Sequence, residues 1–139
     1  MNILGIDYGR KNIGLAWVET GLGVVLPFGQ FLISDFRISR SERDPVLAGQ
    51  ISDLIAKEKI DKIVVGLPIG LDGKENENTK IVQAFVKELK KRIDLPIEFV
   101  DERFTSRQAD AMGGTVSRDE KAAMVILQSY LEQSKQSKQ

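Results

Sequence analysis

The strand order of this protein is decided by residues 1–33, MNILGIDYGRKNIGLAWVETGLGVVLPFGQFLI. Residues 2–7, 13–18 and 24–33 form three apolar runs of strand length, and the first of them ends on an acid. Between the second and third runs, Gly21-Leu22-Gly23 is typical of a hairpin turn. We therefore expect the chain to open with three strands joined by short connections.

Downstream of residue 33 the apolar pattern alternates between helical and strand periodicity. The expected elements are a helix from Asp44 with Leu47, Ile51, Leu54 and Ile55 on one face, a strand over 60–66, a helix with Ile81, Phe85, Leu89 and Ile93 on one face, a strand over 96–100, and helices over 105–112 and 119–133. Asp44 is expected to be the N-cap of its helix and Pro45 its first residue. This order predicts an α/β protein with a mixed five-stranded sheet flanked by helices, which is the layout of the RNase H-like fold.

Length and composition fit one domain. A chain of 139 residues with 42% hydrophobic and 29% charged residues is long enough to bury one core. We assign residues 1–133 to this domain and expect the polar segment 134–139 to be a disordered tail. No apolar run approaches the roughly 20 residues that cross a bilayer, and the N-terminus lacks the basic segment of a signal peptide. We expect a cytoplasmic protein without membrane contact.

Histidine and cysteine are both absent from the sequence. Their absence excludes a Ser-His-Asp triad, a Cys nucleophile and zinc sites built from His or thiolate ligands. Any acid–base or metal chemistry must therefore use Asp, Glu, Lys, Arg, Tyr or hydroxyl groups. Oxygen ligands alone favour Mg²⁺, Mn²⁺ or Ca²⁺ over zinc.

Acidic residues stand where expected elements end or begin. Asp7 ends the first strand beside Gly9, which permits close approach of a ligand to the backbone. Asp101 and Glu102 follow the fifth strand, and neighbouring residues of an extended chain point to opposite faces. Only one of these two acids should therefore face a common site, and the sequence leaves open which one. Asp119 shares the buried face of the last helix.

These acids also have purely structural interpretations. Asp7 could belong to a turn between strands, and Asp119 could be the N-cap of its helix. The small residues Ala122 and Ala123 favour a functional interpretation, because they would let the helix start approach the sheet and bring Asp119 toward Asp7. Acids gathered in this way would repel one another unless a divalent cation neutralised them.

Four segments in this order resemble the YqgF/RuvX family, Holliday-junction-resolvase-like proteins that are also described as pre-16S rRNA nucleases. The matching residues are GIDYGRKNIGLA at 5–16, VVGLP at 64–68 with Asp72-Gly73, DERFTS at 101–106, and Asp119 with Ala122-Ala123 and ILQSYL at 126–131. The resemblance covers nearly the whole chain. It implies an RNase H-like fold and a divalent-metal nuclease that uses Mg²⁺ or Mn²⁺. It also implies catalytic, metal-binding acids at Asp7, Glu102 and Asp119.

The resemblance leaves the substrate open. Arg10, Lys11 and Arg103 lie in the matching segments and are candidates for phosphate contacts. The formal net charge is zero, and residues 113–118, where relatives often carry a basic stretch, hold the single charge of Arg118. The implied role is processing of the 5′ end of pre-16S rRNA in ribosome biogenesis, by a monomer or a homodimer. The alternatives are a Holliday junction resolvase that acts on branched DNA, and a non-catalytic protein that binds RNA or ribosome-assembly factors. An ATP-dependent kinase would need two such domains.

Overall fold

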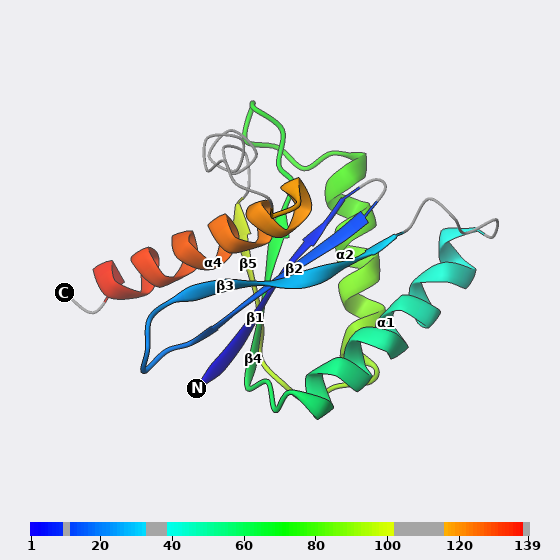
Figure 1. Cartoon of the computed structure of the whole chain (residues 1–139). Helices are drawn as coiled ribbons and strands as arrows, with labels where there is room; N and C mark the ends of the chain where they lie inside the picture. The colour runs from blue at the N-terminus through cyan, green and yellow to red at the C-terminus, as the bar shows by residue number, and fades with distance from the viewer. Residues whose placement is uncertain (10–11, 33–38, 102–115, 138–139) are drawn as a thin grey trace.

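The computed structural model describes residues 1–9, 12–32, 39–101 and 116–137. Five strands form one sheet, namely β1 (Asn2–Tyr8), β2 (Asn12–Glu19), β3 (Val25–Leu32), β4 (Lys62–Leu67) and β5 (Ile97–Asp101). Their order across the sheet is β3-β2-β1-β4-β5. β2 is antiparallel to β1 and β3, whereas β4 is parallel to β1 and β5 is parallel to β4 (Figure 1). The mixed five-stranded sheet expected from the sequence is confirmed.

Helices cover both faces of this sheet. α1 (Arg40–Lys57) and α2 (Glu77–Lys90) pack on one face, and α4 (Arg118–Ser137) lies across the other (Figure 1). Leu4 and Ile6 of β1 belong to the core beneath α1 and α2, while Ile3 belongs to the core beneath α4. β1 is thus buried on both faces, which explains its nearly continuous apolar sequence. No helix in the described ranges is both long and apolar enough to cross a membrane.

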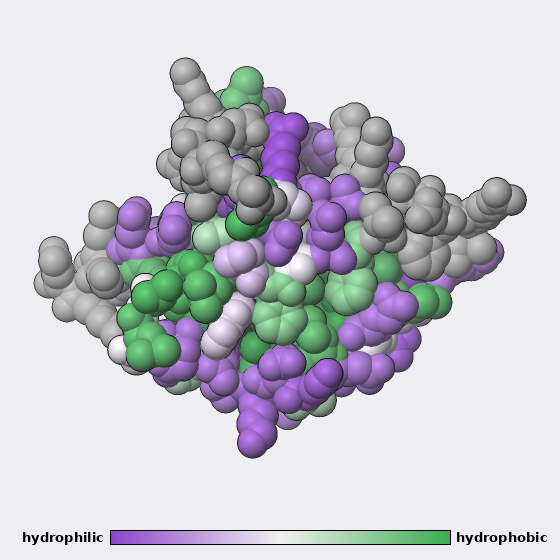
Figure 2. All heavy atoms as spheres, in the orientation of Figure 1, coloured by the Kyte–Doolittle hydropathy of each residue, from purple (hydrophilic) through white to green (hydrophobic). Residues whose placement is uncertain are grey.

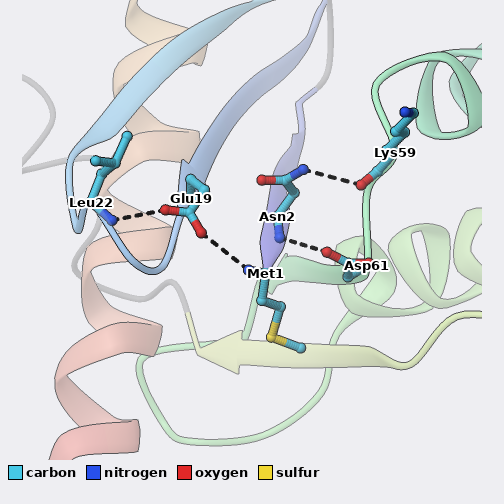
Figure 3. Close-up of polar contacts among 6 residues, drawn as sticks. All are labelled: Met1, Asn2, Glu19, Leu22, Lys59 and Asp61. Atoms are coloured by element: carbon cyan, nitrogen blue, oxygen red, sulfur yellow. Dashed lines mark hydrogen bonds and ion pairs between the residues drawn. The ribbon is translucent and has the colours of Figure 1, made fainter.

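Hydrogen bonds fix the amino end of β1 and the hairpin beside it. The N-terminal ammonium lies 3.1 Å from Glu19 Oε1, and the backbone N–H of Leu22 donates to Glu19 Oε2 at 2.8 Å (Figure 3). Asn2 donates its backbone N–H to Asp61 Oδ2 at 2.7 Å and its side-chain amide to the carbonyl of Lys59 at 3.2 Å. These contacts tie β1 to β2 on one side and to the start of β4 on the other. The carboxyl ends of β1 and β4, which are parallel neighbours, lie together at the opposite end of the sheet.

An exposed apolar patch lies at the same end of the sheet as these contacts. Leu22, Val24 and Leu26 are 77%, 59% and 43% exposed. Figure 2 shows hydrophobic surface around the β2–β3 hairpin and hydrophilic surface over much of the rest of this face. Ligands of open α/β sheets bind beyond the carboxyl ends of the parallel strands. The patch therefore lies at the end away from the expected ligand site.

The expected start of the first helix is wrong. α1 begins at Arg40, and the backbone N–H groups of Glu42 and Arg43 donate to the carbonyl of Ser39. Asp44 is not the N-cap; it lies inside the helix, 5% exposed, and accepts a hydrogen bond from a distant tyrosine. Pro45 is also inside α1, where its ring nitrogen cannot bond to the carbonyl four residues earlier. Burial of Asp44 against the sheet overrides the local capping signal.

The expected C-terminal tail is also partly wrong. α4 continues to Ser137, so residues 134–137 are helical, while 138–139 lie outside the described residues. Ser134 is half-buried and lines a hollow with Tyr130 and with Glu98 and Phe99 of β5. The tail sequence contains Lys and Gln, which favour helices, so the helix can extend past its last large apolar residue. The expected helix over 105–112 falls outside the described residues.

Candidate active site

Asp7 lies near the carboxyl end of β1, on the face that α4 covers. It is paired in the antiparallel register with Gly14 of β2. Residues of a strand alternate between faces, and Ile3 and Gly5 both meet α4: a Cβ added at Gly5 would stand 2.6 Å from Leu127 Cγ. Asp7 therefore points to the side of the sheet where α4 begins, and it is half-buried there.

Asp119 lies in the first turn of α4, but it is not the cap of that helix. The backbone N–H of Glu120 donates to Ser117 Oγ at 3.2 Å, and Ser117 Oγ donates to Glu120 Oε1 at 2.9 Å. Ser117 thus supplies the cap, and the capping interpretation of Asp119 is wrong. The Ser-x-x-Glu pattern of residues 117–120 is the sequence signal of this cap.

The two acids meet at one corner of the sheet, because α4 begins directly over β2. A Cβ added at Gly14 would stand 2.0 Å from the carbonyl oxygen of Asp119 and 2.8 Å from its Cβ. A Cβ added at Gly9 would stand 3.4 Å from Asp119 Oδ1. Since Gly14 is the register partner of Asp7, the structure brings Asp7 and Asp119 together as the sequence analysis expected. Their catalytic role stays a prediction.

Asp101 points away from this corner. Its register partner in β4 is Leu67, which packs against the core beneath α1 and α2. The preceding residue, Val100, is buried in the core beneath α4. Asp101 therefore lies on the face opposite to Asp7. Glu102, the other acid of the pair, lies outside the described residues, as do Arg10, Lys11 and Arg103.

The described part of the corner offers oxygen donors for a metal ion, though fewer than a full site needs. No group of three or more acids that could hold a metal occurs within residues 1–9, 12–32, 39–101 and 116–137. Asn12 begins β2 two residues before Gly14, so both lie on the α4 face. Its Oδ1 is buried and has no hydrogen-bond partner in the structure as described. An amide oxygen beside two carboxylates is a donor set that Mg²⁺ and Mn²⁺ accept.

A buried polar cluster lies behind the corner, on the α1 and α2 side of β1. Tyr8 donates its hydroxyl proton to Asp44 Oδ1 at 2.8 Å and accepts a hydrogen bond from Arg43 Nη2 at 2.9 Å. Burial, reinforced by Asp44, raises the pKa of Tyr8 to about 12. Burial also raises the pKa of Asp44, although the hydrogen bond from Tyr8 and the charge of Arg43 oppose that rise. The cluster fixes the start of α1 against the end of β1.

Tyr8→Phe is expected to destabilise the fold by about 1–3 kcal/mol, because a buried carboxylate loses its donor. The pKa of Asp44 is raised in the folded protein, so Asp44 contributes less to folding stability as the pH rises above 3.8, the ordinary pKa of an aspartate. Without the Tyr8 hydrogen bond, which lowers the pKa of Asp44, this loss of stability is larger. Above pH 10 the unfolded tyrosine ionises while folded Tyr8 stays neutral to about pH 12, so wild type loses stability there and the difference shrinks. Urea denaturation of wild type and Tyr8→Phe from acid pH to pH 12 measures this difference in stability. The control Tyr130→Phe, whose hydroxyl contacts Lys62, should lack the acid-range dependence.

The family model described as "RuvX: Holliday junction resolvase" matches residues 1–133. The chain is 39% identical to a candidate pre-16S rRNA nuclease of Sulfurihydrogenibium sp., over 94% of this chain and 89% of the relative. It is 38% identical to a protein of the same name from Dictyoglomus turgidum, over 95% and 94% of the two chains.

One solved structure shows the same architecture. The RuvC protein of T. thermophilus in complex with a Holliday junction substrate superposes with a TM-score of 0.65. The match covers 91% of this chain and 89% of that one, at 14% sequence identity. At that identity the likeness establishes the fold, which is RNase H-like as the strand order and helix layers indicate.

Proposed function

This chain belongs to the RuvX family of Holliday-junction-resolvase-like proteins, and from that premise we propose that it is a divalent-metal-dependent nuclease acting on structured nucleic acid. It is a hydrolase of phosphodiester bonds, as the family and its relatives are. The observation that carries the metal proposal is the meeting of Asp7 and Asp119 at the carboxyl edge of an RNase H-like sheet. A divalent cation is a ligand that neighbouring carboxylates favour, because its charge offsets their mutual repulsion.

We assign the metal ligands to Asp7, Asp119 and Glu102. Because Asp101 points to the opposite face, Glu102 is the acid of that pair that we propose for the site. The Asn12 amide oxygen would add a neutral donor. These residues would hold Mg²⁺ or Mn²⁺, which would supply an activated water and charge stabilisation of the leaving oxygen, so the reaction would need no histidine. The acids of this chain would hold and orient that charge, and the close packing of α4 on β2 keeps Asp119 beside Asp7.

The proposed substrate is pre-16S rRNA, as the names of the relatives suggest, and we propose that its 5′ end is the part processed. Arg10, Lys11 and Arg103 are proposed to contact its phosphates. The main alternative is resolution of Holliday junctions, which the family description and the RuvC fold favour. A second alternative is non-catalytic binding of RNA or ribosome-assembly factors. We propose that the protein acts in the cytoplasm as a monomer or homodimer.

A cleavage assay separates these functions. The protein is incubated with precursor 16S rRNA, a four-way DNA junction and single-stranded DNA, each with Mg²⁺, Mn²⁺ or EDTA. We expect cleavage that needs the metal and is fastest on the precursor rRNA, and Asp119→Asn should remove it. Preferred cutting of the junction would instead support the resolvase function. Binding of RNA without cleavage under any metal condition would refute the nuclease proposal.

A further inference from the structure

A cavity opens beside Asp7 on the face away from α4. It lies beyond the carboxyl ends of β1 and β4, between α1 and α2, and has a volume of about 180 Å³. One buried water needs roughly 10–15 Å³ measured in this way, so the space can hold a larger polar group. The polar lining comes from Tyr8, Arg40, Arg43 and Asn78, with Asp7 at its border.

Arg43 lines this cavity, and contacts with Tyr8 and Asp44 fix its side chain. Its side chain is 12% exposed, its Nη2 donates to the hydroxyl of Tyr8 at 2.9 Å, and its Nε lies 3.8 Å from Asp44 Oδ1. The Nε is buried and has no hydrogen-bond partner in the structure as described. A buried donor without a partner is unfavourable, so a ligand that accepts its hydrogen bond would gain affinity there. The planar fork of arginine suits two oxygens of one phosphate.

Two further features make the cavity attractive to an anion. Arg40 adds a second guanidinium to the lining. Asn78 is the second residue of α2, whose first N–H groups have no partner within the helix and whose dipole favours negative charge. This helix start is fixed, because Asn76 and Thr79 form a capping box and the Thr79 hydroxyl donates to the carbonyl of Pro68. Asp7 at the border opposes an anion, and Asp44 offsets part of the charge of Arg43, with which it pairs. The attraction for an anion therefore rests on Arg40 and the start of α2 together with the N–H donors of Arg43.

We propose that this cavity binds a backbone phosphate of the nucleic acid strand, next to the bond that is cut at the Asp7 corner. The inference rests on the proposed function, which it deepens by adding a phosphate subsite on the far side of β1. On a chain of zero net charge, the subsite would give one phosphate a local set of donors from Arg40, Arg43 and the start of α2. The subsite also implies a path for the nucleic acid strand, from the corner beneath α4, past the end of β1, toward α2.

The test measures binding in EDTA, so that no cleavage takes place. Precursor 16S rRNA and a four-way junction are titrated with wild type, Arg40→Gln and the matched control Arg92→Gln. Arg92 is exposed just beyond the other end of α2, so both variants remove one surface charge. We expect Arg40→Gln to weaken affinity about 5- to 10-fold at 0.1 M salt and to reduce the salt slope by about 0.9 on duplex DNA. Arg92→Gln should change affinity less than about twofold.

Further measurements locate the site and separate the outcomes. Inorganic phosphate added to wild type should shift the amide NMR signals of Gly9, Arg43 and Asn78. Equal loss of affinity in Arg40→Gln and Arg92→Gln would overturn the proposal, because it would mean that the charge acts only at long range. Phosphate shifts that nucleic acid fails to reproduce would overturn the assignment to the substrate strand and point to a free phosphate ligand. If Arg40→Gln alone loses affinity, and wild type shows no cleavage in the separate assay with Mg²⁺ or Mn²⁺, the subsite stands and the nuclease function is refuted.

Discussion

Asp7→Asn is expected to abolish metal-dependent cleavage while leaving the metal-free protein at least as stable as wild type. Asparagine has nearly the shape of aspartate, so the packing at the end of β1 is preserved. Without metal, we expect the amide to reduce like-charge repulsion at the corner that Asp7 shares with Asp119. With metal, the neutral amide oxygen is a weaker ligand, so both cation affinity and water activation fall. We expect a loss of rate of roughly 10³-fold, which corresponds to about 4 kcal/mol.

Two measurements check this expectation, with Asp53→Asn as the matched control because Asp53 is an exposed acid on α1. Cleavage rates with Mg²⁺ should be normal in the control and lost in Asp7→Asn. Thermal denaturation should show that Mg²⁺ raises the melting temperature of Asp7→Asn less than that of wild type. If Asp7→Asn cuts at the wild-type rate, or gains as much stability from Mg²⁺, Asp7 has only a structural role near the end of β1 and the catalytic assignment is wrong.

The parts of the structure that the sequence predicted are those with local signals. Within the runs over 2–7 and 60–66, residues 3–6 and 63–66 are continuously apolar. This is the pattern of strands buried on both faces, and the two runs became the neighbouring strands β1 and β4. Asp7 at a strand end and Asp119 on an apolar helix face could also be placed from periodicity alone. Strand register and helix packing then bring these two acids together. Glu102, Arg10, Lys11 and Arg103 lie outside the described residues, so their roles stay predictions.

What the sequence did not predict depends on contacts between distant segments. Asp44 and Pro45 carry a strong local capping signal, but Tyr8, which is 36 residues away, holds Asp44 inside α1 instead. The same contact places Arg43 at the wall of the cavity beside Asp7. The sequence pattern starts this helix at Asp44, so Arg40 and Arg43 stand ahead of the expected helix and carry no signal of a site. Only the packing of α1 against the end of β1 shows that they border the site.

The position of Asp119 depends in the same way on a residue without a side chain. Gly14 lies opposite Asp7 in the sheet, and the backbone of α4 rests directly on it. A Cβ at Gly14 would stand 2.0 Å from the carbonyl oxygen of Asp119, a distance that no relaxation of side chains can relieve because the contact is with backbone. Any side chain at this position must therefore move the start of α4 away from β2, and Asp119 with it.

Gly14→Ala is accordingly expected to destabilise the protein by about 1–3 kcal/mol, the usual effect of overpacking. It should also reduce metal-dependent cleavage by about 10²-fold or more, because a displacement of about 1 Å in a catalytic group can have that effect. The control is Gly49→Ala in α1, where an added Cβ meets nothing within 4 Å and alanine should stabilise the helix by about 0.5–1 kcal/mol. Urea denaturation and cleavage rates of both variants measure the two effects. If Gly14→Ala were as stable and as active as wild type, α4 could not rest on β2 at this point, and Asp119 would not be held beside Asp7.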